Sequence, residues 1–192
     1  MKIILASASP RRSQLLEQIG LNFIVHPSQV EEKYIEGQKP HIWVQNVALA
    51  KALDVANSLK EGIVIGADTI VVNENYILGK PKDEAEAQLM LKSLSGKKHQ
   101  VLTGFAIVDG TNTDNYFTQV EITNVKFRSL RDKEIKAYVR SKEPLDKAGA
   151  YGIQGLGALL IEEIEGCYFN VVGLPLSKIA LGLEKFGVEV WK

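Results

Sequence analysis

Apolar residues recur at helical spacing in several segments of this chain. The apolar positions that follow Ser9 in the sequence predict a helix over residues 10–19. Ser9 is its expected N-cap, and Gly20 lies just past its end. A longer helix is predicted over residues 40–59, where apolar residues recur every three or four positions and Lys51 falls on the same face. Further helices are predicted over residues 83–94, 131–141 and 175–186.

Shorter apolar runs between these helices predict strands. The most apolar run covers residues 63–72. Two other runs, 99–108 and 116–127, flank the polar stretch Asp109–Asn115, which predicts an antiparallel hairpin. A shift in the apolar alternation predicts a bulge near Thr123–Asn124. Additional strands are predicted over 2–6, 22–26, 76–78 and 159–164, with a loop over 27–38, a tight turn over 73–75 and a glycine-rich segment over 146–157. The mixture of helix–strand units and a hairpin predicts an α/β fold with a mixed sheet.

Composition limits the function classes that fit. The chain has 192 residues, of which 45% are hydrophobic and 24% charged, as expected for one globular domain over 1–192 or for two packed lobes. Lys and Arg number 23 and so do Asp and Glu, so there is no basic excess of the kind that nucleic-acid binding needs. We therefore expect no nucleic-acid partner, and any anion site must be a local cluster.

No segment of the sequence resembles a membrane span or a secretory signal. The apolar run at residues 3–6 is too short for either, because a span needs about 20 apolar residues. Cys167 is the single cysteine, so an intrachain disulfide is excluded. No cation neighbours it in the sequence, which favours a structural thiol over a catalytic one. These features predict a cytoplasmic protein with no membrane partner.

The segment Ala6-Ser7-Ala8-Ser9-Pro10-Arg11-Arg12 places hydroxyls and two guanidinium groups where a strand leads into a helix. Free backbone N–H groups and the helix dipole add to the attraction for an anion at such a point. The segment predicts a phosphate site. The alternative is a capped helix with two surface arginines.

Asp68 lies within the most apolar run, in Gly66-Ala67-Asp68-Thr69. A buried carboxylate is costly unless it is paired or bound to a metal, which favours a functional role over a structural one. Glu31-Glu32 could supply a second metal carboxylate, and Lys51, on an apolar helix face, needs a buried partner.

Two further segments combine special backbone residues with polar side chains. Gly79-Lys80-Pro81 holds a lysine suited to a phosphate, although a surface lysine is the simpler explanation. The segment Asp146–Gly157 allows close backbone approach to a flat ligand, and Gln154 offers both a donor and an acceptor for a base edge. A flexible glycine loop is the alternative. Scattered histidines disfavour a zinc site or a histidine-based triad.

Taken together, these motifs resemble the Maf family. The resemblance rests on Leu5–Arg12, Gly66–Thr69, Gly79–Pro81, Asp146–Gly155 and Gly173–Leu176, which follow the family's order and spacing over essentially the whole chain. It implies a mixed twisted sheet with flanking helices and a deep cleft, similar to the inosine triphosphatases. The form Asp146-Lys147-Ala148-Gly149-Ala150-Tyr151-Gly152-Ile153-Gln154-Gly155 resembles the branch that acts on dTTP and UTP.

The resemblance also implies an activity and a set of site residues. Maf proteins are metal-dependent hydrolases that convert a nucleoside triphosphate to a monophosphate and pyrophosphate. By position, Asp68 is the proton acceptor, and Asp68 with Glu32 is expected to hold a divalent cation, Mg²⁺ or Mn²⁺. The positions tied to substrate choice are Arg11, Thr69 and Gln154, and the remaining cleft positions are Ser7, Arg12, Lys51 and Lys80.

Two alternatives stay open from the sequence. One is a house-cleaning pyrophosphatase for other, modified nucleotides; the other is a nucleotide-sensing regulator of septum formation. Release of pyrophosphate with Mg²⁺ or Mn²⁺ separates the enzyme from the sensor. The expected partner is a nucleoside triphosphate, and the oligomeric state is left open, a homodimer being one alternative.

Overall fold

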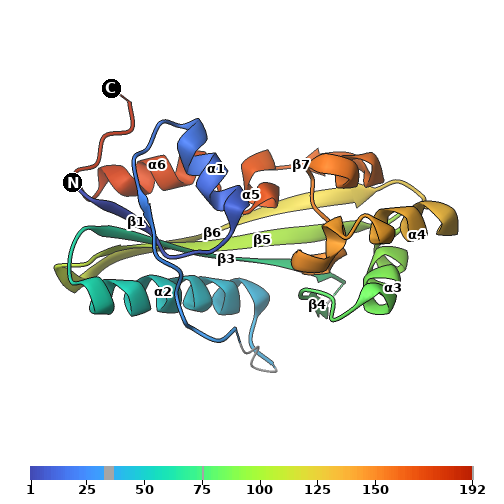
Figure 1. Cartoon of the computed structure of the whole chain (residues 1–192), viewed down its shortest axis with the longest axis horizontal. Coiled ribbons are helices and arrows are strands. Elements are labelled where there is room, and N and C mark those ends of the chain that lie inside the picture. The colour runs from blue at the N-terminus through green and yellow to red at the C-terminus, as the bar shows by residue number, and fades with distance from the viewer. Residues whose placement is uncertain (33–36, 75, 192) are drawn as a thin grey trace. The chain divides into compact units, whose positions relative to one another are not determined.

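The computed structural model describes residues 1–32, 37–74 and 76–191 (Figure 1). These residues form a seven-stranded sheet in the order β2-β1-β3-β5-β6-β7, with β4 paired to β3. The strands are β1 (Ile3–Leu5), β2 (Ile24–Val25), β3 (Ile63–Asn73), β4 (Tyr76–Leu78), β5 (Lys98–Asp109), β6 (Asn112–Phe127) and β7 (Ile161–Glu165). β1 runs parallel to β2 and β3, whereas β4 and β7 run antiparallel to β3 and β6. The predicted mixed α/β fold is confirmed.

Five helices lie at the predicted segments, and the C-terminal half of the chain contains one further α-helix and short 3-10 helices. They are α1 (Pro10–Gln18), α2 (Pro40–Leu59), α3 (Glu84–Leu94), α4 (Asp132–Arg140), α5 (Tyr168–Val172) and α6 (Leu176–Glu184). Three 3-10 helices, η1 (Glu143–Asp146), η2 (Ala148–Ala150) and η3 (Gly155–Leu160), occupy most of the glycine-rich segment. Helix α5 and these turns were not predicted. No described helix is long and apolar enough to cross a membrane.

The chain groups into two compact units. The first comprises Met1–Asp68, Thr103–Glu121 and Gly173–Lys192, and the second comprises Thr69–Leu102 and Ile122–Val172. The expectation of a single domain with two lobes around a central cleft stays a prediction.

In the first unit, α2 covers one face of the sheet, and α1 and α6 lie over the opposite face (Figure 1). Two glycines let α2 lie close to the strands. A Cβ atom on Gly66 of β3 would lie 2.4 Å from the carbonyl oxygen of Ala48, and one on Gly104 of β5 would lie 2.4 Å from that of Val44. This close packing keeps Lys51, on the buried side of α2, against the sheet.

The second unit has its own core, in which α3 packs against α4. Phe127, Tyr151 and His99 meet edge to face there, with ring centroids 4.7–5.4 Å apart. The Nε2 atom of His99 lies 2.7 Å from the hydroxyl of Tyr151. Burial lowers the pKa of His99 to about 4, so this imidazole stays neutral.

The predicted hairpin forms, but its turn is shorter than the polar stretch Asp109–Asn115. Only Gly110 and Thr111 connect the strands, and residues 112–115 already belong to β6. The carboxylate of Asp109 accepts hydrogen bonds from the backbone N–H and the hydroxyl of Thr111, at 2.9 and 2.7 Å, which closes the turn. Pairing with β5 then outweighs the low strand propensity of the polar residues.

The bulge predicted near Thr123–Asn124 does not occur at that position in the pairing of β6 with β7. From Thr123 to the end of β6 the burial alternates regularly, with Thr123, Val125 and Phe127 buried. The hydroxyl of Thr123 donates to the carbonyl of Cys167 at 3.1 Å and accepts from its N–H at 3.0 Å, which explains why a polar residue lies on the inner face. The register irregularity falls instead between Lys126 and Phe127, where β6 pairs with β7.

Candidate functional site

Asp68 is buried in β3, with 5% of its surface exposed. Alternate strand residues share a face, so Asp68 points the same way as Gly66, toward α2. There the Nζ of Lys51 donates to Oδ1 of Asp68 at 2.8 Å and to Oε1 of Glu32 at 2.5 Å. The predicted lysine, aspartate and second carboxylate therefore meet in the first unit.

The other oxygen of Asp68, Oδ2, is buried and has no hydrogen-bond partner among the described residues. Burial raises the pKa of Asp68 above its ordinary value, while the charge of Lys51 opposes that rise and the charge of Glu32 adds to it. Structures satisfy most buried polar atoms, so an orphaned carboxylate oxygen of raised basicity indicates an atom kept for a ligand or a proton.

Arg12 lies beside this carboxylate, with 9% of its surface exposed. Its Nη1 donates to Oγ of Ser7 at 3.0 Å and to the carbonyl of Ala67 at 2.8 Å, and its Nε donates to the carbonyl of Gly173 at 2.9 Å. Burial lowers the pKa of Arg12, and the charge of Asp68 opposes this. The guanidinium is thus held in one orientation next to Asp68.

The start of α1 supports the same cluster. Ser9 occupies the predicted N-cap position, although its side chain makes no capping bond. Its N–H instead donates to the hydroxyl of Ser7 at 3.3 Å, the hydroxyl that also contacts Arg12. Arg11 is half-buried, and its charge contributes to lowering the pKa of Arg12. Both arginines and Ser7 therefore lie together, and their role as a phosphate site stays a prediction.

Two carboxylates are available for the expected metal. Asp68 and Glu32 bind the same amine, and Oδ2 of Asp68 is unpartnered among the described residues. Carboxylate oxygens are the ligands that Mg²⁺ and Mn²⁺ prefer. The described residues contain no group of three or more His, Cys, Asp or Glu side chains that could hold an ion. The pair fits a cation that completes its coordination with water and phosphate oxygens.

The remaining candidates, Thr69, Lys80 and Gln154, lie in the second unit. Thr69 is half-buried in β3, while Lys80 and Gln154 are exposed. The N–H of Gly149 donates to the carbonyl of Gly79 at 2.9 Å, which joins the lysine loop to the glycine-rich segment. A backbone hydrogen bond therefore connects these two predicted motifs, whereas the functional roles of Thr69, Lys80 and Gln154 stay predictions.

Sequence reasoning missed the side chains that organise the glycine-rich segment. Glu143 accepts the backbone N–H groups of Leu156 and Gly157 at 3.0 and 3.1 Å, and its Oε1 also accepts the hydroxyl of Tyr138 at 2.9 Å. The segment is thus held by specific bonds, which argues against the alternative of a flexible glycine loop. No local pattern indicates these bonds, because the N–H donors follow Glu143 by 13 and 14 residues.

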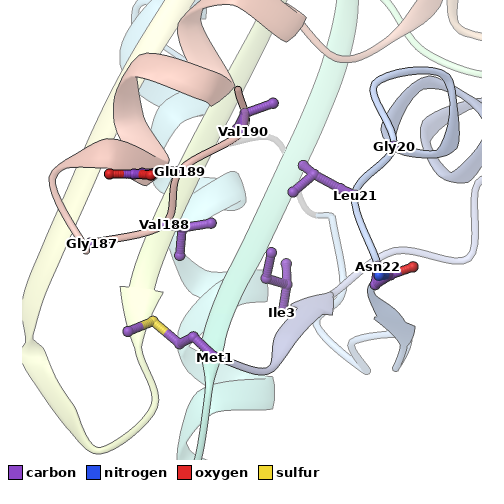
Figure 2. A pocket seen from close by; sticks show the side chains of 9 residues that line it. All are labelled: Met1, Ile3, Gly20, Leu21, Asn22, Gly187, Val188, Glu189 and Val190. Atoms are coloured by element: carbon purple, nitrogen blue, oxygen red, sulfur yellow. The ribbon is translucent and has the colours of Figure 1, made fainter. Parts of the chain in front are cut away.

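The first unit contains a pocket with a volume of about 340 Å³, whose lining side chains are drawn in Figure 2. It is lined by Met1, Ile3, Gly20, Leu21, Asn22, Gly187, Val188, Glu189 and Val190. None of the candidate site residues lines it. The predicted deep cleft therefore stays a prediction.

Two proteins of known sequence match this chain over nearly its whole length. A "dTTP/UTP pyrophosphatase" of Acetivibrio thermocellus is 53% identical, over 100% of this chain and 98% of the relative. A protein of the same name from Clostridioides difficile is 49% identical, over 97% of this chain and 95% of the relative.

The fold has relatives among solved structures. A HAM1 protein from Coxiella burnetii matches with a TM-score of 0.52 and 17% identity, over 96% of this chain and 99% of that one. This likeness concerns the fold alone. The family model described as "Maf-like protein" matches residues 2–186, nearly the whole chain. The chain therefore belongs to the Maf family.

Proposed function

We propose that this chain is a nucleoside triphosphate pyrophosphatase that converts dTTP and UTP to the nucleoside monophosphate and pyrophosphate. The observation that carries the proposal is the buried carboxylate of Asp68, bonded through one oxygen to Lys51 while the other has no partner among the described residues. The names of the relatives at about half identity support the choice of substrates.

Asp68 serves as the general base. Its Oδ2 accepts a proton from a water molecule whose oxygen attacks the α-phosphorus. The new P–O bond forms as the bond from the α-phosphorus to the bridging oxygen breaks, and the electron pair leaves with pyrophosphate. The raised pKa of Asp68 strengthens it as a base, whereas the bond from Lys51 to Oδ1 keeps its orientation fixed.

Asp68 and Glu32 would hold the divalent cation, Mg²⁺ or Mn²⁺. When bound, such a cation polarises phosphate oxygens and acidifies the attacking water. Lys51 bonds to both carboxylates, so it limits their separation and offsets part of their mutual repulsion.

The cations of the cluster are suited to a polyphosphate. Arg12 is fixed by its bonds to Ser7, Ala67 and Gly173, so its charge is positioned before substrate arrives. Arg11 adds a second guanidinium at the start of α1. In the second unit, Lys80 contributes a further cation, and Thr69 and Gln154 contribute to the choice of nucleotide.

The test is a panel of nucleoside triphosphates with Mg²⁺ or Mn²⁺, in which monophosphate and pyrophosphate are both quantified. We expect dTTP and UTP to give equal amounts of the two products. Release of inorganic phosphate with a diphosphate product would contradict attack at the α-phosphorus. Preference for modified nucleotides would favour the house-cleaning alternative, and binding without turnover would favour the sensor.

A further inference from the structure

Residues Gly152–Gly157 form a turn that wraps around two side chains. One is Tyr138, in the last part of α4, and the other is Glu143, the first residue of η1. The hydroxyl of Tyr138 accepts the N–H of Gly152 at 3.2 Å, and Glu143 accepts the N–H groups of Leu156 and Gly157. Tyr138 and Glu143 therefore hold the turn at both of its ends, and we call these two side chains the pins.

The two pins are linked to each other. The hydroxyl of Tyr138 donates to Oε1 of Glu143 at 2.9 Å while it accepts from Gly152, so it must keep its proton to do both. Burial raises the pKa of Tyr138 well above its ordinary value, with the neighbouring Glu143 adding to the rise. The phenol therefore stays protonated over the working pH range, and the two pins act as one unit.

Close packing limits the turn to glycine at two positions. A Cβ atom on Gly155 would lie 2.7 Å from Oε2 of Glu143, and its φ of +63° also disfavours other residues. A Cβ atom on Gly157 would lie 2.0 Å from the carbonyl oxygen of Gly152 and 2.8 Å from the hydroxyl of Tyr138. The glycines thus allow the backbone to reach the two pins, which gives them a role beyond chain flexibility.

Gln154 lies midway between the pinned ends. Its backbone is extended, with φ of −91° and ψ of 168°, and its side chain is exposed. A side-chain amide can read a base edge only if its donor and acceptor are held in place, because recognition geometry tolerates errors of about 0.5 Å. The rigidity that Gln154 needs comes from its neighbours and not from its own contacts.

We propose that Tyr138 and Glu143 are positioning residues for base selection. They fix the backbone on either side of Gln154, so that its amide meets the edge of a uracil or thymine ring in one orientation. This inference rests on the proposed function, in which Gln154 contributes to the choice of nucleotide.

The test compares Tyr138→Phe and Glu143→Gln with the wild-type chain. Tyr138→Phe removes one oxygen and leaves the N–H of Gly152 without its acceptor. Glu143→Gln keeps the shape but places an amide where several donors converge. Glu162→Gln is the matched control, because this exposed glutamate of the same unit pairs with Lys126 and contacts neither pin.

Values of kcat and KM are measured for UTP, dTTP, CTP and GTP. For both pin variants we expect KM for UTP and dTTP to rise about tenfold, the effect of one misplaced hydrogen bond. We expect kcat for the same substrates to stay within about threefold, since Asp68 is untouched. The ratio of kcat/KM for UTP over CTP should fall about tenfold, and Glu162→Gln should leave it unchanged.

Amide hydrogen exchange gives a readout that does not depend on turnover. The amides of Gly152, Leu156 and Gly157 should exchange faster in both variants than in the wild type. An equal loss of kcat/KM for every nucleotide would indicate a merely structural role and overturn the inference, as would an unchanged nucleotide ratio with unchanged exchange. A wild-type chain that releases no pyrophosphate from any nucleotide would instead refute the proposed function, so the two failures are distinguishable.

Discussion

In the cluster around Asp68, the buried side chains of Asp68 and Lys51 bond to each other, whereas in the Gly152–Gly157 turn charged and phenolic side chains bond to backbone N–H groups. The first arrangement fixes charge: the pair of Lys51 and Asp68 has side chains only 10% and 6% exposed. The second fixes shape, and it leaves Gln154 exposed.

The difference suggests that reactivity and selectivity depend on separate parts of the chain. Buried charges have a desolvation cost, which the protein tolerates where a reaction needs strong fields. Hydrogen bonds to backbone N–H groups fix the conformation of a turn without burying a charge pair, and a fixed conformation is what recognition of a nucleotide base needs. Substitutions of Asp68 or Lys51 should therefore reduce turnover of all nucleotides together, whereas substitutions in the turn should change the ratio between them.

The largest effect is expected for Asp68→Asn. An amide at this position cannot accept the proton from water, so kcat for dTTP and UTP should fall about 10³-fold or more. The loss should be equal for every nucleotide, as measured by pyrophosphate release. Activity near that of the wild type would remove Asp68 from its role as base.

The same variant should not be less stable. Because burial raises the pKa of Asp68 in the folded chain, its contribution to stability is present below the ordinary pKa of aspartate and is lost as pH rises through the higher, folded value. Above that folded pKa the wild type carries an unfavourable buried charge, so Asp68→Asn should raise Tm in a calorimetric scan run at such a pH. A lower Tm at that pH would show that the bond to Lys51 outweighs burial.

Local patterns predicted the first region well and the second poorly. The helix over 40–59 has the predicted bounds, and its period placed Lys51 on the buried face, while a carboxylate inside an apolar strand identified Asp68. Glu143 gave no such signal, because the backbone N–H group of Leu156, to which it bonds, lies 13 residues further along the chain. Side chains on regular helices and strands can be located from the apolar periodicity of the sequence. Side chains that bond to backbone N–H groups of a later turn can be located only once the tertiary structure is known.

Removal of the cation between the carboxylates should give the next largest effect. In Lys51→Met, Asp68 keeps its burial but loses its bonded partner, so the free energy of unfolding should fall by about 3 kcal/mol. The pKa of Asp68 should rise further, which moves the acid limb of the kcat profile to higher pH. Lys97→Met, which breaks an exposed pair with Glu74, is the control and should change stability by less than about 1 kcal/mol. Equal changes in the free energy of unfolding for Lys51→Met and Lys97→Met would show that the buried pair stabilises the fold no more than the exposed one.

Gly66→Ala tests whether close packing of α2 positions the cluster. The new methyl group would lie 2.4 Å from the carbonyl oxygen of Ala48, so α2 must shift, and overpacking should lower the free energy of unfolding by about 2 kcal/mol. Because Lys51 lies on this helix, turnover of all nucleotides should fall together. Gly79→Ala is the stability control, since a Cβ atom there would meet no atom within 4 Å beyond its chain neighbours. Full activity and unchanged denaturant midpoint in Gly66→Ala would separate helix packing from the site.

The smallest and most selective effect is expected for Gln154→Ala. This exposed side chain contributes little to the fold, so Tm should stay within about 1–2 °C of the wild type. Loss of one donor and one acceptor should reduce kcat/KM for UTP and dTTP about tenfold, with CTP and GTP changing less. Competition assays with mixed nucleotides measure this ratio directly. A uniform loss across all four nucleotides would place Gln154 with the catalytic cluster and end the division between reactivity and selectivity.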